Sequence, residues 1–190
     1  MCTNRPVSWR SMEVLSDRLA MRPFVAGDVD HVHVYASDPA VCFFTDWGPN
    51  TPADTEDFIA RAVAEGAPAN IAVTLVGDVL GAAGVVPAGT VVGSLSAVPA
   101  PTGAGHELGW VVRRDLWGQG IATEAVATLI GWLANEHGVT EFIARCRPQN
   151  RASSRVMEHV GMTYVERIPG DVVIKGTPAD SDIYRLVIPR

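Results

Sequence analysis

Residues 115–125 constrain the fold of this chain more than any other stretch. They follow an apolar run at 108–112 and lead into the strongest helical pattern of the sequence, at about 122–137. A strand, a glycine turn and a helix in this order present backbone N–H groups to a ligand, because glycine allows positive φ and the first helical turn has unpaired donors. The helix dipole adds positive potential there, so the stretch is typical of a site for a pyrophosphate.

The helix that follows the glycines carries one continuous apolar stripe, at i, i+3, i+4, i+7, i+8 and i+11. Its members are Ala122, Ala125, Val126, Leu129, Ile130 and Leu133. His137 falls in the last turn, and Gly138 is a candidate C-cap. We therefore expect a helix over 122–137 with one face buried.

The composition fits one globular domain. The chain has 190 residues, of which 47% are hydrophobic and 19% charged, which is enough to bury a sizeable core. We expect residues 1–14 to be a loose N-terminal tail and 15–190 to form a single domain. No apolar stretch approaches the roughly 20 residues that span a bilayer, and the N-terminus lacks a basic region followed by an apolar one. We expect a cytoplasmic protein with no membrane partner.

Charge and cysteine content narrow the classes of partner and cofactor. A net charge of −6, with 15 Lys and Arg spread along the chain, argues against nucleic acid and suits a cationic partner better. Cys2, Cys42 and Cys146 are widely spaced, with no CxxC pair and no histidine at ligand spacing. We expect free thiols and no metal site.

The rest of the chain alternates predicted strands and helices without an internal repeat. Further helices are predicted from Asp28 through Tyr35, over 55–65, and from Asn150 until Gly161. Strands are predicted at 15–24, 71–76, 90–98, 106–112, 139–147, 164–168 and 183–188. The glycine-punctuated segment 77–89 separates the second and third strands, a turn follows at 99–103, and a loop separates the last two strands.

Residues 39–52 are predicted to be mostly loop, although they contain three bulky aromatic residues, Phe43, Phe44 and Trp47. Two interpretations stay open: the aromatic residues close the core as a lid, or they form a wall of a substrate pocket.

Four blocks of the sequence together resemble the GCN5-related N-acetyltransferase (GNAT) family, in particular its RimJ/RimL-like branch. They are 107–112, 117–125, 150–153 and 158–162, and the resemblance extends over roughly 15–188. It implies an α/β (α+β) acyl-CoA N-acyltransferase fold, with a mixed, mostly antiparallel sheet of about six to seven strands flanked by helices. It also implies an acyltransferase that moves an acetyl group from acetyl-CoA to a primary amine by direct attack.

The family's phosphate loop falls on Gly120-Ile121-Ala122, whereas Trp117 replaces the Gln or Arg with which that loop often begins. The resemblance implies a set of residues that bind acetyl-CoA. The set is Trp110, Val111, Val112, Arg113, Gly118, Gln119, Gly120, Ile121, Ala122, Thr123, Asn150 and Ser153. Two other interpretations of the glycine loop are a turn that only links strand to helix and a dinucleotide loop. The dinucleotide loop lacks its third glycine here and does not open a βαβ unit.

The resemblance also implies the catalytic residues. Glu107 is the candidate general base, acting through water, and a structural glutamate paired with an arginine is the alternative. Many members carry a tyrosine as general acid where this chain has Met157, and the resembling branch uses a serine that falls on Ser153. Asn150 and Ser153 would also make an ordinary helix cap, and the two roles are compatible.

The acceptor amine stays open between a protein N-terminus and a small amine or aminoglycoside-like antibiotic, and a non-catalytic acyl-CoA-binding module is a further alternative. We expect the acceptor pocket to be built from residues 38–58 and from the loop after Tyr164. A homodimer is compatible with the family.

Overall fold

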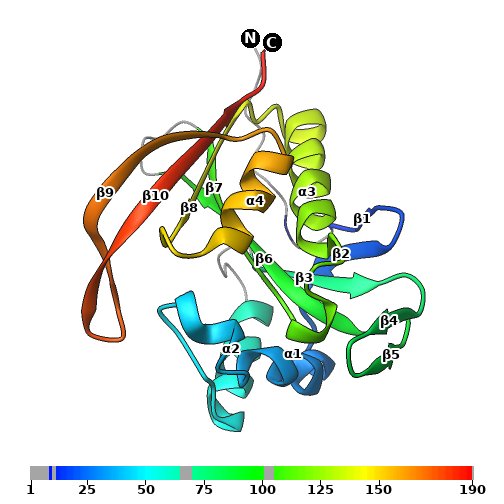
Figure 1. Cartoon of the computed structure of the whole chain (residues 1–190). Coiled ribbons are helices and arrows are strands. Elements are labelled where there is room, and N and C mark those ends of the chain that lie inside the picture. The colour runs from blue at the N-terminus through cyan, green and yellow to red at the C-terminus, as the bar shows by residue number, and fades with distance from the viewer. Residues whose placement is uncertain (1–8, 10–11, 65–69, 101–104, 190) are drawn as a thin grey trace.

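The computed structural model describes residues 9, 12–64, 70–100 and 105–189. Their core is an eight-stranded sheet of order β1-β2-β3-β6-β7-β8-β10-β9 (Figure 1). The strands are β1 Val14–Leu15, β2 Leu19–Pro23, β3 Asn70–Leu75, β6 Val91–Pro99, β7 His106–Val112, β8 Glu141–Cys146, β9 Thr163–Ile174 and β10 Thr177–Val187. A separate hairpin pairs β4 Val79–Gly81 with β5 Gly84–Val86. The helices are α1 Val29–Ala36, α2 Pro52–Val63, α3 Ile121–His137 and α4 Arg151–His159.

All neighbouring strands of the large sheet are antiparallel except β7 and β8, which are parallel. A parallel pair needs a long crossover, and here α3 provides it between the two strands. The expected mixed, mostly antiparallel sheet flanked by helices is thus confirmed, with eight strands in place of six or seven.

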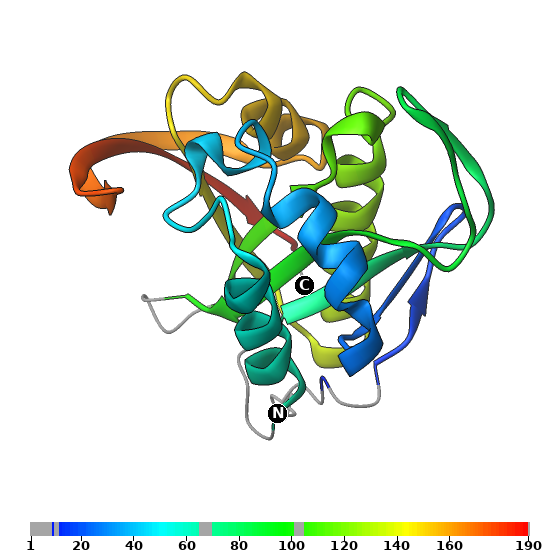
Figure 2. The ribbon, with the colours of Figure 1, turned by 90° about the horizontal axis from the view of Figure 1, so that it is seen from below.

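Helices cover both faces of the sheet (Figures 1 and 2). Alternate residues of β3 belong to two apolar clusters, because successive side chains of a strand point to opposite faces. Ile71 and Val73 pack in the cluster that contains Leu129 of α3, whereas Ala72 packs in the cluster that contains Val32 of α1 and Ile59 of α2. The sheet is therefore a middle layer, and a site at its centre can be reached by residues from either side.

The helix α3 forms as its apolar stripe predicts. Ala125, Val126, Leu129 and Leu133 are fully buried, with at most 1% of each residue exposed. Gly138 adopts the left-handed conformation at the C-cap, and its N–H donates to the carbonyl of Ala134. The predicted helix and its C-cap are confirmed.

Several predicted boundaries differ from the observed ones. The helix α2 begins at Pro52, three residues before the predicted start, because Thr51 and Asp54 form a capping box. The segment 77–89 contains the β4–β5 hairpin. Strands β9 and β10 extend through the predicted loop and meet at Lys175 and Gly176, both at positive φ, in a two-residue hairpin turn.

The predicted tail lies largely outside the described residues, but Met12 is buried and Val14 and Leu15 pair with β2. Glu65 and part of the predicted turn at 99–103 also lie outside them. In the described part of the chain, no helix is both long and apolar enough to cross a membrane.

Candidate active site

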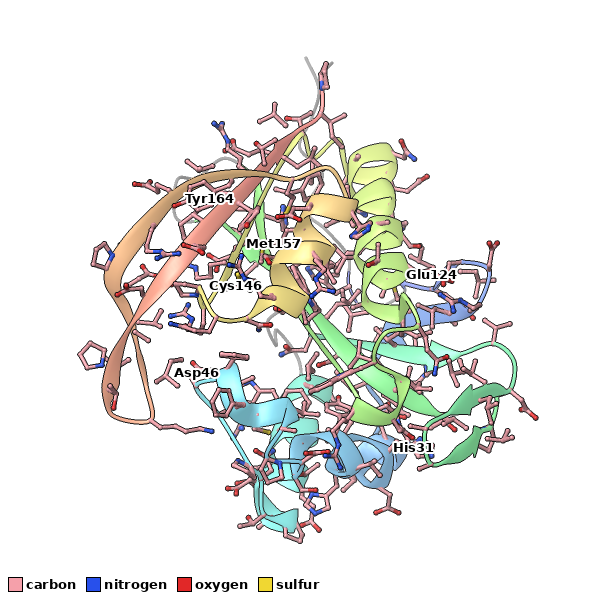
Figure 3. The ribbon with its side chains drawn as sticks, in the orientation of Figure 1. His31, Asp46, Glu124, Cys146, Met157 and Tyr164 are labelled. Atoms are coloured by element: carbon pink, nitrogen blue, oxygen red, sulfur yellow. The ribbon has the colours of Figure 1, made fainter. Side chains whose placement is uncertain are left out.

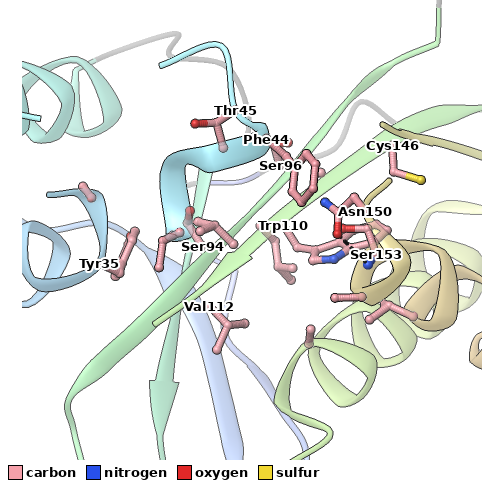
Figure 4. Close-up of a pocket in the computed structure, with 18 of the residues that line it drawn as sticks. Tyr35, Phe44, Thr45, Ser94, Ser96, Trp110, Val112, Cys146, Asn150 and Ser153 are labelled. Carbon is pink, nitrogen blue, oxygen red and sulfur yellow. Dashed lines mark hydrogen bonds between the residues drawn. The ribbon is translucent and has the colours of Figure 1, made fainter. Parts of the chain in front are cut away.

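A cavity of about 1720 Å³ is lined by residues from both faces of the sheet. One part of it is bounded by the end of β7, the start of α3 and the start of α4 (Figure 4). The other part is bounded by residues of α1, α2 and β9 and by the loop between α1 and α2. The predicted donor residues line the first part: Trp110, Val111, Val112, Gly118, Gly120, Ile121, Ala122, Thr123, Asn150 and Ser153.

The strands β7 and β8 separate at this cavity. They pair only from His106 to Leu108 on β7, although β7 continues to Val112 and β8 to Cys146. Arg113 donates its N–H to Val92 on β6, and hydrogen-bonding direction alternates along an antiparallel pair. The backbone N–H and C=O of Trp110 therefore face the gap that β8 has left, where an extended ligand can pair with them.

The glycine loop beside this gap offers unpaired donors. Gly118 and Gly120 both have φ of +78°, which a residue with a side chain rarely adopts. Within the described part of the chain, the N–H groups of residues 118–123 have no hydrogen-bond partner, and the first bond of α3 runs from the N–H of Glu124 to the carbonyl of Gly120. Loop and helix end together form an anion site.

Glu124, in the first turn of α3, fastens this loop to the β1–β2 turn (Figure 3). Its carboxylate accepts hydrogen bonds from the Ser16 hydroxyl at 2.7 Å, the Arg18 N–H at 2.9 Å and the Arg18 Nε at 2.7 Å. Burial alone would raise the pKa of Glu124, but these bonds outweigh it and lower the pKa. Arg18 also donates to the carbonyl of Gln119, so the loop is held at two points.

Two predicted donor residues do not line the cavity with their side chains. Arg113 forms a paired contact with Asp115 at 2.6 and 2.8 Å. The amide of Gln119 donates to the carbonyl of Leu80, which ties the β4–β5 hairpin to the loop. Trp117, at the position where the family often has Gln or Arg, donates its indole N–H to the carbonyl of Val112 at 2.8 Å. These three side chains hold the loop through contacts with the protein itself, and Trp117 also lines the cavity.

Asn150 and Ser153 lie together at the start of α4 (Figure 4). The side-chain oxygen of Asn150 accepts the backbone N–H of Ser153 at 3.2 Å, which is the helix cap that the sequence suggests. The cap uses the backbone of Ser153 and leaves its hydroxyl without a partner in the described part of the chain. The same arrangement thus caps the helix and presents a hydroxyl to the cavity.

Glu107 lies outside the set of residues that line the cavity. Its carboxylate accepts two hydrogen bonds from Arg145, at 2.7 and 2.8 Å, and Arg145 also donates to Asp171 of β9 at 2.9 Å. The pKa of Asp171 is lowered, because bonds from Ser181 and Arg145 outweigh the effect of burial. Glu107 therefore has the environment of a structural glutamate paired with an arginine, and its role as a base stays a prediction.

The loop between α1 and α2 forms the opposite wall. Phe43, Phe44 and Trp47 line the cavity, and Phe43 is 68% exposed, so this side chain does not close the core. The core of the loop is made instead by its neighbours Val41 and Cys42, which are buried. The β9–β10 hairpin reaches this loop, because Nζ of Lys175 donates to the carbonyl of Cys42 at 2.9 Å.

Three further residues line the cavity without a signal in the sequence that predicts it. Tyr35 is fully buried in α1 with its ring against the cavity, and burial raises its pKa far above its usual range. Burial raises the pKa of Cys146 to about 11, so this cysteine is a neutral thiol at neutral pH. Arg147 follows it at the end of β8. Tyr35 lies on α1, whereas Cys146 and Arg147 lie at the end of β8, and the fold places these distant segments beside one cavity.

Comparisons with known proteins agree with this geometry. Residues 18–163 match the model of the acetyltransferase (GNAT) domain. The chain is 26% identical over 151 residues to an uncharacterized N-acetyltransferase, YnaD, of Bacillus subtilis, and the match covers 80% of this chain and 82% of YnaD. An acetyltransferase of the GNAT family from Bacillus anthracis superimposes with a TM-score of 0.80 at 27% identity, over 93% of this chain and 98% of that one.

The RimL ribosomal L7/L12 alpha-N-protein acetyltransferase has the same fold, with a TM-score of 0.75 at 18% identity over 93% of this chain and 94% of that one. The family match covers most of the chain, and it includes the gap between β7 and β8, the glycine loop and the start of α4. The chain belongs to the GNAT family of acetyltransferases.

Proposed function

We propose that this chain transfers the acetyl group of acetyl-CoA directly to a primary amine, the α-amine of a protein N-terminus. The observation that carries the proposal is the gap between β7 and β8, which opens beside the unpaired N–H groups of residues 118–123. The pantetheine arm of the donor would pair with the backbone of Trp110 as a short added strand. The pyrophosphate would lie on the glycine loop, at the positive end of α3.

The residues around the gap supply the other needs of the reaction. The backbone N–H of Trp110 would polarise the thioester carbonyl, as a donor aimed at a developing negative charge does. The side-chain amide of Asn150 would hold the pantetheine arm, and the hydroxyl of Ser153 would protonate the departing thiolate. An α-amine has an ordinary pKa near 8, so its deprotonation needs little help at neutral pH.

An α-amine acceptor is supported by the similarity in fold to RimL, which is described as an alpha-N-protein acetyltransferase. The blocks at 107–112, 117–125, 150–153 and 158–162 support the same branch. The proposal therefore places the chain in the RimJ/RimL-like branch of the family, as a cytoplasmic enzyme. A homodimer is compatible with the family, and the proposal does not depend on it.

Two measurements test the proposal. Calorimetric titration should show acetyl-CoA binding with a dissociation constant on the order of 1 μM to 1 mM, the usual range for enzyme substrates. Thiol release from acetyl-CoA should accelerate with peptides that have a free N-terminus and should not accelerate with the same peptides blocked by formylation. Saturable binding without acceleration by any amine would overturn the catalytic part, and no binding at millimolar donor would overturn the whole.

A further inference from the structure

Arg147 differs from every other buried charged residue in the described part of the chain. Three charged residues are at least nine-tenths buried: Asp28, Arg147 and Asp182. Asp28 is paired with Arg22, and Asp182 is paired with Arg167. In the described residues Arg147 forms no ion pair. A buried charge without a partner is costly, so this guanidinium calls for an explanation.

The protein partners of Arg147 are neutral. Its two Nη atoms donate to the carbonyl of Ala179 at 3.3 Å and to the hydroxyl of Ser181 at 2.6 Å, both on β10. Since a guanidinium has five N–H donors, three of them have no partner within the described ranges of the chain. Two carboxylates belong to the surroundings of Arg147. Asp171 accepts hydrogen bonds from Ser181 and Arg145, and Asp180 accepts the N–H of Gly170. By contrast, Arg145, two residues earlier, has two carboxylate partners.

Arg147 lies where its free N–H donors could contact an acceptor. Arg147 lines the main cavity and also a smaller cavity of about 350 Å³, and Phe43, Phe44 and Ile174 line both. It therefore lies between the β9–β10 hairpin and the loop that joins α1 to α2, here called the aromatic loop. The part of the main cavity that this loop bounds is the acceptor side. Along the chain it is three residues before Asn150, and both residues line the main cavity, so an acceptor bound to Arg147 would share that cavity with the donor.

We propose that Arg147 binds an anionic group of the acceptor, a carboxylate of the same molecule whose amine is acetylated. This rests on the acetyl transfer to a primary amine that is proposed above, and it adds a carboxylate to the description of the acceptor. A planar guanidinium binds a carboxylate through two parallel hydrogen bonds, and the bonds are strong where water is excluded. Two sources supply this chemistry: the free carboxylate of an amino acid, and an acidic side chain in the first residues of a protein N-terminus.

The ammonium group of the acceptor would also meet side chains of opposite charge, which are carboxylates that line the cavity. Asp46, Asp54 and Asp57 line the part of the cavity that is bounded by α2 and the loop before it, together with one cation, Arg61, so carboxylates outnumber cations there. Exposed carboxylates at the mouth attract an ammonium group before it is deprotonated. A zwitterionic acceptor would thus meet negative charge at the rim and positive charge inside.

The experiment compares matched acceptors on the full chain at saturating acetyl-CoA, with thiol release as the readout. Phenylalanine and phenylalaninamide form one pair, and peptides that begin with Ser-Glu and Ser-Gln form the other, with rates corrected for the fraction of free amine. We expect a KM about 10- to 100-fold lower for the carboxylate member of at least one pair, as a charge-assisted bond gives. The pair that shows the preference identifies the source of the carboxylate.

Arg147→Gln should raise the KM of the carboxylate acceptor to that of its amide, while the KM of the amide and the binding of acetyl-CoA stay unchanged. Arg147→Lys keeps the charge and should retain part of the preference, which guards against a folding defect in the first variant. Arg185→Gln is the matched control, because Arg185 lies on β10 but pairs with Glu141 outside the cavity. Melting temperatures are recorded for all three.

Two results would overturn the assignment of Arg147. One is acceptance of amines by the unmodified chain with no preference for a carboxylate in either pair. The other is an equal loss of the carboxylate acceptor and its amide in Arg147→Gln and Arg147→Lys. Failure of every amine, charged or not, would instead count against the proposed function, so the two failures can be distinguished.

Discussion

Replacing Glu124 by Gln should destabilise the fold and loosen the glycine loop together. The carboxylate of Glu124 is only 18% exposed and accepts bonds from Ser16 and from the backbone and side chain of Arg18. Glutamine keeps one oxygen acceptor but loses the charge, and it directs an NH₂ group at donors. A hydrogen bond to a charged group contributes roughly 1.5–3 kcal/mol. Arg18 is 41% exposed, so solvent screening discounts its part, and we expect a loss of about 2 kcal/mol in the free energy of unfolding.

A domain of this size changes its melting temperature by about 2–4 °C per kcal/mol, so Glu124→Gln should melt about 4–8 °C lower at pH 7. The pKa of Glu124 is lowered in the folded protein. Its contribution is therefore complete above the ordinary pKa of 4.5 and is lost as the pH falls through the lower folded value. Calorimetric melting from pH 3 to pH 7 should show the two proteins converging in acid.

Glu136→Gln is the control, since Glu136 lies on the same helix but is exposed. The reasoning fails if Glu124→Gln melts within about 1 °C of the unmodified chain at pH 7, or if a difference between them persists unchanged at pH 3. Because Arg18 also binds the Gln119 carbonyl, acetyl-CoA affinity should fall in Glu124→Gln and stay constant in the control.

Three other substitutions test the site. Ser153→Ala keeps the backbone N–H that caps α4, so the melting temperature should be unchanged. The kcat should fall about 10²- to 10⁴-fold, far more than the affinity for acetyl-CoA, as loss of a general acid predicts, and an unchanged kcat in steady-state assays would exclude that role. Glu107→Gln should lower kcat with a changed pH profile if Glu107 is the base, whereas a lower melting temperature with kcat retained would assign it to holding Arg145. Gly120→Ala should cost about 1–2 kcal/mol from its left-handed backbone and weaken donor binding, whereas Gly131→Ala, inside α3 with open space around it, should raise the melting temperature.

The elements that the sequence predicts well are those whose burial follows a regular period. The strand at 106–112 coincides with β7, and the helix at 122–137 differs from α3 by one residue, because both bury one face against the core. The fold and the enzyme class were implied by the resemblance to the GNAT family, which the blocks in and around these elements carry. The start of α2 could have been found too, since Thr51 and Asp54 have capping-box spacing.

The long β9–β10 hairpin could not be predicted in the same way. Most residues of β9 are exposed, so the strand has no buried face to impose a period of two, and Pro169 and Gly170 interrupt its sequence. Its stability comes from pairing with β10, which in turn pairs with β8. The ion pair of Glu107 with Arg145 could not be predicted from the sequence either. Arg145 is 38 residues away and contacts Glu107 only because β7 and β8 pair in parallel.

The contact between the hairpin tip and the aromatic loop has a practical consequence. Lys175, whose ammonium group donates to the Cys42 carbonyl, is the only lysine in the sequence. An amine-reactive reagent can therefore modify the side-chain amine of Lys175 and the α-amine of the chain, and no other primary amine. The extent of labelling at Lys175 measures how often the hairpin tip leaves the loop, and a gain of one acetyl group there would report the enzyme's action on its own chain without any background from other side chains.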